Sequence, residues 1–263
     1  MGVITTITLS EINAIFPSYN FTKITPTSDG VMDTTYILHT QDSSFILKKY
    51  ERQMGSKIEK DRELLKTLSS AGLNVPLLLD SNKEWYLYKK LDGKVPTNIE
   101  TYHIQALARF MAKLHSQTKK MPQETLFITN YKLDETLLFT KKNFFSYYKK
   151  LQTLQTYRVK NDGFIHGDIF KDNTVFDGSK IGVFDFIDGG YGEFSFDIAV
   201  ALVAFNGKKH PLFVQLFLNT YNQKAPKKIA KDELLSMMTL ASNFYALLRI
   251  QKYKNTKKAK ELL

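Results

Sequence analysis

The spacing of apolar and polar residues over the first ninety positions predicts a region made mostly of β-strands. Short runs rich in β-branched and aromatic side chains alternate with polar stretches, and the polar stretch 41–44 predicts a hairpin turn. Apolar residues at helical spacing predict one helix over residues 57–70, which ends before Gly72. The predicted strands cover residues 35–40, 45–50, 75–79 and 85–88.

Beyond residue 90 the apolar residues recur at helical spacing instead. This change in pattern predicts two lobes, an N-terminal lobe of residues 1–90 and a helical C-terminal lobe of residues 91–263. One short β insertion is expected at residues 174–187. The predicted helices cover residues 104–115, 135–157, 211–221 and 232–253.

Composition narrows the class of protein. The chain has 263 residues, 43% of them hydrophobic and 13% aromatic, which supplies enough apolar surface for a real core and excludes a disordered chain. The absence of cysteine excludes thiol nucleophiles, cysteine-ligated zinc and iron–sulfur clusters. No long apolar span or leader-like segment stands out, so we expect a soluble cytoplasmic protein with no membrane partner.

A formal net charge of +11 raises the question of nucleic acid. Only five of the 37 basic residues are arginine, the side chain that best forms paired hydrogen bonds with bases and phosphates. The lysines alternate with apolar residues as the outer faces of helices do. We therefore expect no nucleic-acid partner, and a positive field that attracts a small polyanion such as a nucleotide.

The chemistry concentrates in one stretch, Phe164 to Phe176, where His166, Asp168 and Asn173 form the pattern H-x-D-x-x-x-x-N. Two short apolar runs joined by Asp-Gly follow, which predicts a β-hairpin that returns Asp185 to the side of Asn173. An amide oxygen and a carboxylate suit the hard cation Mg²⁺, which accompanies nucleotide phosphates. Asp168 then remains as a carboxylate for another task.

Taken together, these motifs resemble the aminoglycoside phosphotransferase and choline kinase superfamily. The resemblance implies an α+β, bilobal protein-kinase-like fold, with a small antiparallel-sheet N-lobe containing one helix and a larger, mainly helical C-lobe. It also implies an enzyme that transfers the γ-phosphoryl group of ATP to a hydroxyl group of a small-molecule substrate. Besides the catalytic loop, the matching segments are Phe45–Lys48, Gly72–Pro76, Leu107–His115 and Phe196–Ala199.

The resemblance assigns roles to residues of this chain. Asp168 is expected to accept the hydrogen bond of the substrate hydroxyl and to take its proton late in the reaction. Asn173 and Asp185 are expected to hold Mg²⁺ between the phosphates. Lys48 is expected to contact the α- and β-phosphates, with a helix carboxylate holding the ammonium group; Glu59 is the expected partner and Glu63 the alternative.

Further positions follow from the same resemblance. Gly30 lies where the nucleotide loop belongs, and the backbone around Tyr88 to Leu91, which includes Lys90, is expected to bind the adenine. His166 is expected to be a structural member of the catalytic loop rather than a base.

Three acidic residues after Asp185 need separate readings. Asp197 lies in an apolar run, where a carboxylate needs a partner, so we expect it to brace the catalytic loop through hydrogen bonds. Asp188 and Glu193 lie in a glycine-rich loop. They are either substrate residues that bind an ammonium group or ordinary solvated loop acids.

Within the superfamily, the resemblance is greatest to homoserine kinase of the protein-kinase-like type. Residues 166–173 match that family's H-G-D-[LI]-F-x-D-N pattern, and residues 30–36 are similar to its nucleotide loop. Asp33, Thr35 and Lys48 depart from the family pattern, so choline, ethanolamine, sugars and aminoglycosides remain alternative acceptors. A nucleotide-binding pseudokinase is the alternative that is not an enzyme; it is disfavoured because Lys48, Asp168 and Asp185 are all present.

Overall fold

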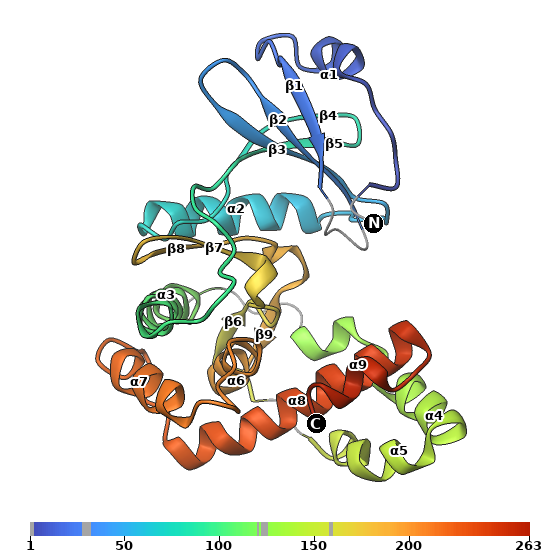
Figure 1. Cartoon of the computed structure of the whole chain (residues 1–263), viewed down its shortest axis with the longest axis vertical. Coiled ribbons are helices and arrows are strands. Elements are labelled where there is room, and N and C mark those ends of the chain that lie inside the picture. Colours follow the sequence, from blue (N-terminus) through green and yellow to red (C-terminus); the bar gives the residue numbers. More distant parts are fainter. Residues whose placement is uncertain (1–2, 28–32, 120, 122–125, 158–159) are drawn as a thin grey trace. The chain divides into compact units, whose positions relative to one another are not determined.

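The computed structural model describes residues 3–27, 33–119, 121, 126–157 and 160–263 (Figure 1). The chain forms two compact units. The first, here called the sheet unit, comprises residues 1–93 and 182–187; the second, the helical unit, comprises residues 94–181 and 188–263. The sequence predicted two continuous lobes, 1–90 and 91–263. In the structure, residues 182–187 belong to the first unit although they lie far along the chain from it.

The sheet unit is built around an antiparallel five-stranded sheet with the order β1-β2-β3-β5-β4. Strand β3 lies in its middle, so that Lys48 is paired with Thr35 on one side and with Tyr86 on the other. A side chain on this strand is therefore held by backbone pairing from both directions. The strands are β1 (Lys23–Pro26), β2 (Thr34–His39), β3 (Ser44–Lys49), β4 (Leu78–Asn82) and β5 (Trp85–Lys89).

Strand β4 differs most from the expectation. Residues 75–79 were predicted as a strand, but pairing begins only at Leu78 and continues into exposed polar residues. Pro76 has no N–H to give to a ladder, and an edge strand can pair through its backbone without apolar side chains. The hydrophobic pattern therefore could not locate this strand.

Two helices accompany the sheet. Helix α1 (Leu9–Ile15) begins with a reciprocal capping box between Thr8 and Glu11 and buries Ile12 in a core cluster that it shares with residues of the sheet. Helix α2 (Lys57–Ser70) has the bounds expected from sequence and buries Ile58, Leu65 and Leu68.

Helices dominate the helical unit, with short strands among them. Two pairs of short strands, β6 with β9 and β7 with β8, form separate two-stranded sheets. The strands are β6 (Gly163–Ile165), β7 (Thr174–Asp177), β8 (Lys180–Val183), whose last two residues belong to the sheet unit, and β9 (Gly190–Gly192). The α-helices are α3 (Thr101–Thr118), α4 (Leu133–Asn143), α5 (Phe145–Leu151), α6 (Phe194–Ala204), α7 (Pro211–Tyr221), α8 (Lys231–Tyr253) and α9 (Lys257–Lys260). The short 3₁₀ helices are η1 (Phe127–Asn130), η2 (Gln152–Gln155), η3 (Lys171–Asn173) and η4 (Phe186–Asp188).

The helix predicted over residues 135–157 is interrupted. Phe144 leaves the helical conformation, with φ −143° and ψ 58°, and separates α4 from α5. Just before it, the side chain of Asn143 donates to the carbonyl of Phe139 at 2.8 Å. Asparagine competes for backbone partners in this way and weakens a helix where it occurs.

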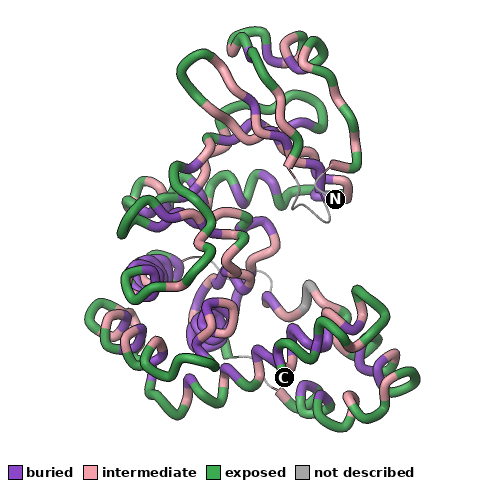
Figure 2. Tube along the Cα trace, viewed as in Figure 1, coloured by how far each residue is buried: buried purple, intermediate pink, exposed green. Residues whose placement is uncertain are grey.

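Helix α6 forms the interior of the helical unit. It packs against α8, and residues 194–202 are all buried, as Figure 2 shows. Its one acidic residue, Asp197, is fully buried, which makes its hydrogen-bond partners essential. In the part of the chain that the structure describes, no helix combines the length and apolar character that crossing a membrane requires.

Candidate active site

The H-x-D-x-x-x-x-N motif follows strand β6 and closes through the single turn of η3. The backbone N–H of Asn173 donates to the carbonyl of Phe170 at 3.0 Å. The amide nitrogen Nδ2 of Asn173 donates to Asp168 twice, to its carbonyl at 2.8 Å and to its carboxylate at 3.0 Å. The turn therefore brings two of the expected site residues, Asp168 and Asn173, into direct contact.

These bonds also orient the Asn173 amide. Its nitrogen is committed to Asp168, and among the described residues no hydrogen bond occupies its oxygen, Oδ1. An amide oxygen left open is a ligand suited to a hard divalent cation. The donor set on this side of the site fits the expected metal.

Gly167 permits the sharp bend of the loop before Asp168. Its φ is +74°, and a Cβ added there would lie 2.1 Å from a ring carbon of Phe127. A side chain at this position would meet both backbone strain and an aromatic ring. The glycine is therefore required by geometry as well as by the motif.

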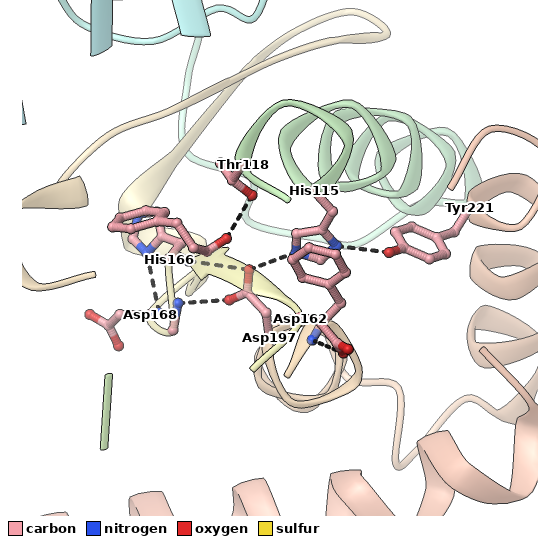
Figure 3. Close-up of polar contacts among 10 residues, drawn as sticks. His115, Thr118, Asp162, His166, Asp168, Asp197 and Tyr221 are labelled. Atoms are coloured by element: carbon pink, nitrogen blue, oxygen red, sulfur yellow. Dashed lines mark hydrogen bonds and ion pairs between the residues drawn. The ribbon is translucent and has the colours of Figure 1, made fainter. Parts of the chain in front are cut away.

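Asp197 braces the loop that carries Asp168 from helix α6 (Figure 3). One carboxylate oxygen accepts the N–H of Gly167 at 2.7 Å, and the other accepts the N–H of His166 at 3.3 Å. The ring nitrogen Nδ1 of His166 in turn accepts the N–H of Asp168 at 3.2 Å. These contacts support the structural roles expected for His166 and Asp197.

The brace extends to helices α3 and α7. His115 Nε2 lies 3.0 Å from the carboxylate of Asp197, and His115 Nδ1 lies 2.8 Å from the Tyr221 hydroxyl (Figure 3). The His115 ring stacks on Phe194 with centroids 4.1 Å apart. Burial, followed by the charge of Asp197, raises the pKa of Tyr221, so its hydroxyl keeps its proton. Tyr221 has no local signal in the sequence that would mark it as a partner of His115.

In the sheet unit, the ammonium group of Lys48 lies 2.6 Å from a carboxylate oxygen of Asp185. Burial lowers the pKa of Lys48, but the charge and hydrogen bond of Asp185 more than offset it, so that the pKa is raised and the side chain stays positive. The ammonium group also lies 5.0 Å from the ring centroid of Tyr50. Asp185 has a φ of 71°, an unusual conformation for a residue with a side chain.

The helix carboxylates take other positions than expected. The side chain of Glu59 is 70% exposed and pairs with Arg62 at 3.6 Å, and Glu63 is exposed. Neither is the partner that the structure gives to Lys48, which is Asp185. The buried acid of α2 is Asp61, three residues after Ile58 and four before Leu65 on the helix stripe that faces the core. That spacing was a signal in the sequence.

Tyr88 has a role within the sheet unit that was not foreseen. Its hydroxyl lies 3.0 Å from the hydroxyl of Tyr50, and burial raises the pKa of both groups. The ammonium group of Lys90 donates to the carbonyl of Leu91 at 3.4 Å. Adenine binding by the backbone of this segment stays a prediction, and Gly30 lies outside the described residues.

Glu193 is 2% exposed and precedes the first residue of α6. Its oxygen Oε1 accepts the Tyr157 hydroxyl at 2.7 Å and the N–H of Lys160 at 2.9 Å. This geometry favours an anchoring role for Glu193 over binding of a substrate ammonium group. Asp188, the last residue of η4, is half-buried, and its role stays a prediction.

The described residues contain no cluster of three or more histidine or acidic side chains that could hold a metal ion. The two expected ligands belong to different units, Asn173 to the helical unit and Asp185 to the sheet unit. A magnesium site that uses both residues stays a prediction.

Comparison with known proteins decides the family. Residues 23–231 match the model of the phosphotransferase enzyme family, a span that contains Lys48, Asp168, Asn173 and Asp185. The chain belongs to the phosphotransferase enzyme family. The phosphotransferase resembles curated proteins named homoserine kinase, and it is 22% identical to one from Polaromonas naphthalenivorans (strain CJ2), over 93% of this chain and 87% of the relative. It is 23% identical to another homoserine kinase from Methylobacillus flagellatus, over 77% of this chain and 70% of the relative.

Solved structures agree on the fold of the phosphotransferase. An amicoumacin kinase superposes with a TM-score of 0.73 at 18% identity, over 97% of this chain and 93% of the other. A choline kinase from Streptococcus pneumoniae superposes with a TM-score of 0.69 at 13% identity, over 96% of this chain and 98% of the other. The predicted superfamily and the protein-kinase-like α+β fold are confirmed.

Proposed function

We propose that this phosphotransferase transfers the γ-phosphoryl group of ATP, with Mg²⁺ as the metal, to the hydroxyl group of homoserine. The observation that carries the reaction class is the closed loop in which Asn173 and the brace of Asp197 hold Asp168. The amicoumacin kinase was solved with AMP-PNP and Ca²⁺, which supports a nucleoside triphosphate and a divalent cation. The curated relatives named homoserine kinase favour homoserine as the acceptor.

Each residue would act through charge or position. Asp168 would accept the hydrogen bond of the substrate hydroxyl and so aim the hydroxyl oxygen at the γ-phosphorus. The carboxylate would take the hydroxyl proton late in the transfer. The amide oxygen of Asn173 and the carboxylate of Asp185 would hold Mg²⁺, which neutralises phosphate charge when bound. Lys48 would then transfer its ion pair from Asp185 to the α- and β-phosphates.

The acceptor is tested by measuring ADP release and phosphorylated product together, with homoserine, choline, ethanolamine, simple sugars and aminoglycosides. We expect homoserine to give the highest kcat/KM. Asp168→Asn should lower kcat by about a hundred- to ten-thousandfold, because the general base is lost while the fold is kept.

The matched control is Asp172→Asn, since Asp172 is an exposed acid four residues along the same loop. We expect this variant to retain wild-type kcat. Phosphorylation of another acceptor in preference to homoserine would overturn the substrate assignment. An Asp168→Asn enzyme as active as the wild type would overturn the role of the base.

A further inference from the structure

The peptide unit that joins Gly167 to Asp168 is held along both edges. On one edge, the N–H of Asp168 donates to His166 at 3.2 Å. On the other edge, the carbonyl of Gly167 accepts a hydrogen bond from the hydroxyl of Tyr245. The orientation of this peptide plane sets the direction in which the side chain of Asp168 leaves the backbone.

Tyr245 reaches the loop from helix α8, far along the chain from the motif. Its side chain is buried, and its ring packs edge-on against Phe170, with centroids 4.9 Å apart and planes at 63°. Phe170 is the aromatic residue of the H-G-D-I-F motif. Phe170 therefore holds the ring of Tyr245, and the hydroxyl of Tyr245 holds the carbonyl of Gly167 in the same loop. A tyrosine ring held in this way loses little further freedom when its hydroxyl bonds.

The hydroxyl is a permanent donor. Burial raises the pKa of Tyr245 well above its ordinary value, and the nearby charge of Asp168 raises it further. The carbonyl of Gly167 is the acceptor that the structure gives to this hydroxyl. The single hydroxyl proton is therefore available at any working pH.

We propose that Tyr245 is a positioning residue that fixes the Gly167–Asp168 peptide and so aims Asp168 at the acceptor hydroxyl. The inference rests on the proposed phosphoryl transfer. It adds a hydroxyl from the last long helix to the brace that Asp197 provides from α6: the N–H of Gly167 is held by α6 and its carbonyl by α8.

Tyr245→Phe tests the inference, because it keeps the ring and deletes only the hydroxyl. With the carbonyl released, we expect kcat for the acceptor to fall about tenfold, the loss of one hydrogen bond, with the KM for ATP unchanged. We also expect more ADP released per phosphorylated product, since a poorly aimed Asp168 lets water compete with the acceptor. Loss of folded protein would lower both rates equally and leave that ratio unchanged.

A second readout does not need activity. The N–H of Asp168 belongs to the same peptide unit, so its hydrogen exchange should speed up about tenfold in Tyr245→Phe. The matched control is Tyr157→Phe, which deletes a hydroxyl bonded to Glu193 at 2.7 Å in the same unit. The control should leave both the product ratio and the exchange of Asp168 unchanged.

The outcomes separate the two proposals. Faster exchange at Asp168 in a protein that phosphorylates no acceptor would show that Tyr245 fixes the Gly167–Asp168 peptide, but it would overturn the proposed function and, with it, the aiming of Asp168 at an acceptor. An active enzyme in which Tyr245→Phe changes neither ratio nor exchange would overturn the inference alone. If Tyr245→Phe does not fold, Phe170→Leu removes the ring that holds Tyr245, and unchanged exchange at Asp168 in that variant would overturn the inference.

Discussion

At the scale of single residues, the loop that carries Asp168 depends on one position, Gly167, where a side chain cannot be accommodated. Gly167 combines a positive φ with close approach of the Phe127 ring. Gly178, in the turn between β7 and β8, has a similar φ of +56° but no atom within 4 Å of the place a Cβ would take. A side chain at Gly178 would meet backbone strain alone, whereas a side chain at Gly167 would meet backbone strain and a clash with Phe127.

We predict that Gly178→Ala lowers the free energy of unfolding by about 1 kcal/mol, the cost of placing a side chain in the left-handed region. Gly167→Ala should cost more than about 3 kcal/mol, because Phe127 must also move. Urea denaturation followed by circular dichroism measures both. Equal losses for the two variants would show that the Phe127 ring yields without cost.

The sequence also contains a signal at this scale for the buried acid of helix α2. The resemblance predicts Glu59 or Glu63, acids of the predicted helix, as the partner of Lys48. The stripe that faces the core runs through Ile58, Asp61 and Leu65, so helical spacing marks Asp61 as the buried acid. The pairing of Lys48 with Asp185, 137 residues away, had no such local signal.

At the scale of elements, helices α3 and α6 are joined by a polar contact in an otherwise apolar interior. His115 and Asp197 are both fully buried, and each has a second partner on the far side, Tyr221 and Gly167 respectively. A buried carboxylate of this kind stabilises only while its partners remain.

A double-mutant cycle measures this contact. His115→Phe and Asp197→Ala should each destabilise the protein, and the double variant should be more stable than the sum of the two losses predicts. We expect a coupling energy of about 1–3 kcal/mol, as for residues of one hydrogen-bonded network. Strict additivity in thermal or urea unfolding would show that the two side chains act independently.

Element by element, the sequence was most informative where the structure is local. The bounds of α2 follow from the spacing of Ile58, Leu65 and Leu68, and the contact between Asp168 and Asn173 follows from a single turn. Helix α1 and the break at Phe144 depend on side-chain bonds to the backbone, which apolar periodicity does not register. The contacts of Tyr221 and Tyr245 join distant segments, and one sequence gives no means of pairing them.

At the scale of the whole molecule, the net charge of +11 and the family point to different partners. We predict that ATP with Mg²⁺ raises the unfolding temperature by an amount that grows with ligand concentration. At a ligand concentration of 100 times Kd, binding adds about 2.7 kcal/mol to the free energy of unfolding. Duplex and single-stranded DNA should give no shift at physiological salt, because scattered lysines bind phosphate weakly once screened.

Lys48→Met is the control for this experiment. It should remove most of the shift with ATP, because the ammonium group that is expected to contact the phosphates is gone while a long apolar stem is retained. If DNA at physiological salt stabilised wild type and variant alike, the expectation that the positive charge attracts a nucleotide rather than nucleic acid would be wrong.

The return of residues 182–187 to the sheet unit limits how this protein can be divided. The N–H of Val183 donates to the carbonyl of Asn74 at 3.1 Å, and Ile187 fills a cluster with Tyr50, Met54 and Ile58. A gene fragment that stops after residue 93 would therefore encode an N-terminal half that lacks Ile187 in its hydrophobic cluster and lacks Asp185, the ion-pair partner of Lys48. A second fragment that begins at residue 94 carries residues 182–187, so expression in two parts would succeed only if the first part could take up that hexapeptide from the second.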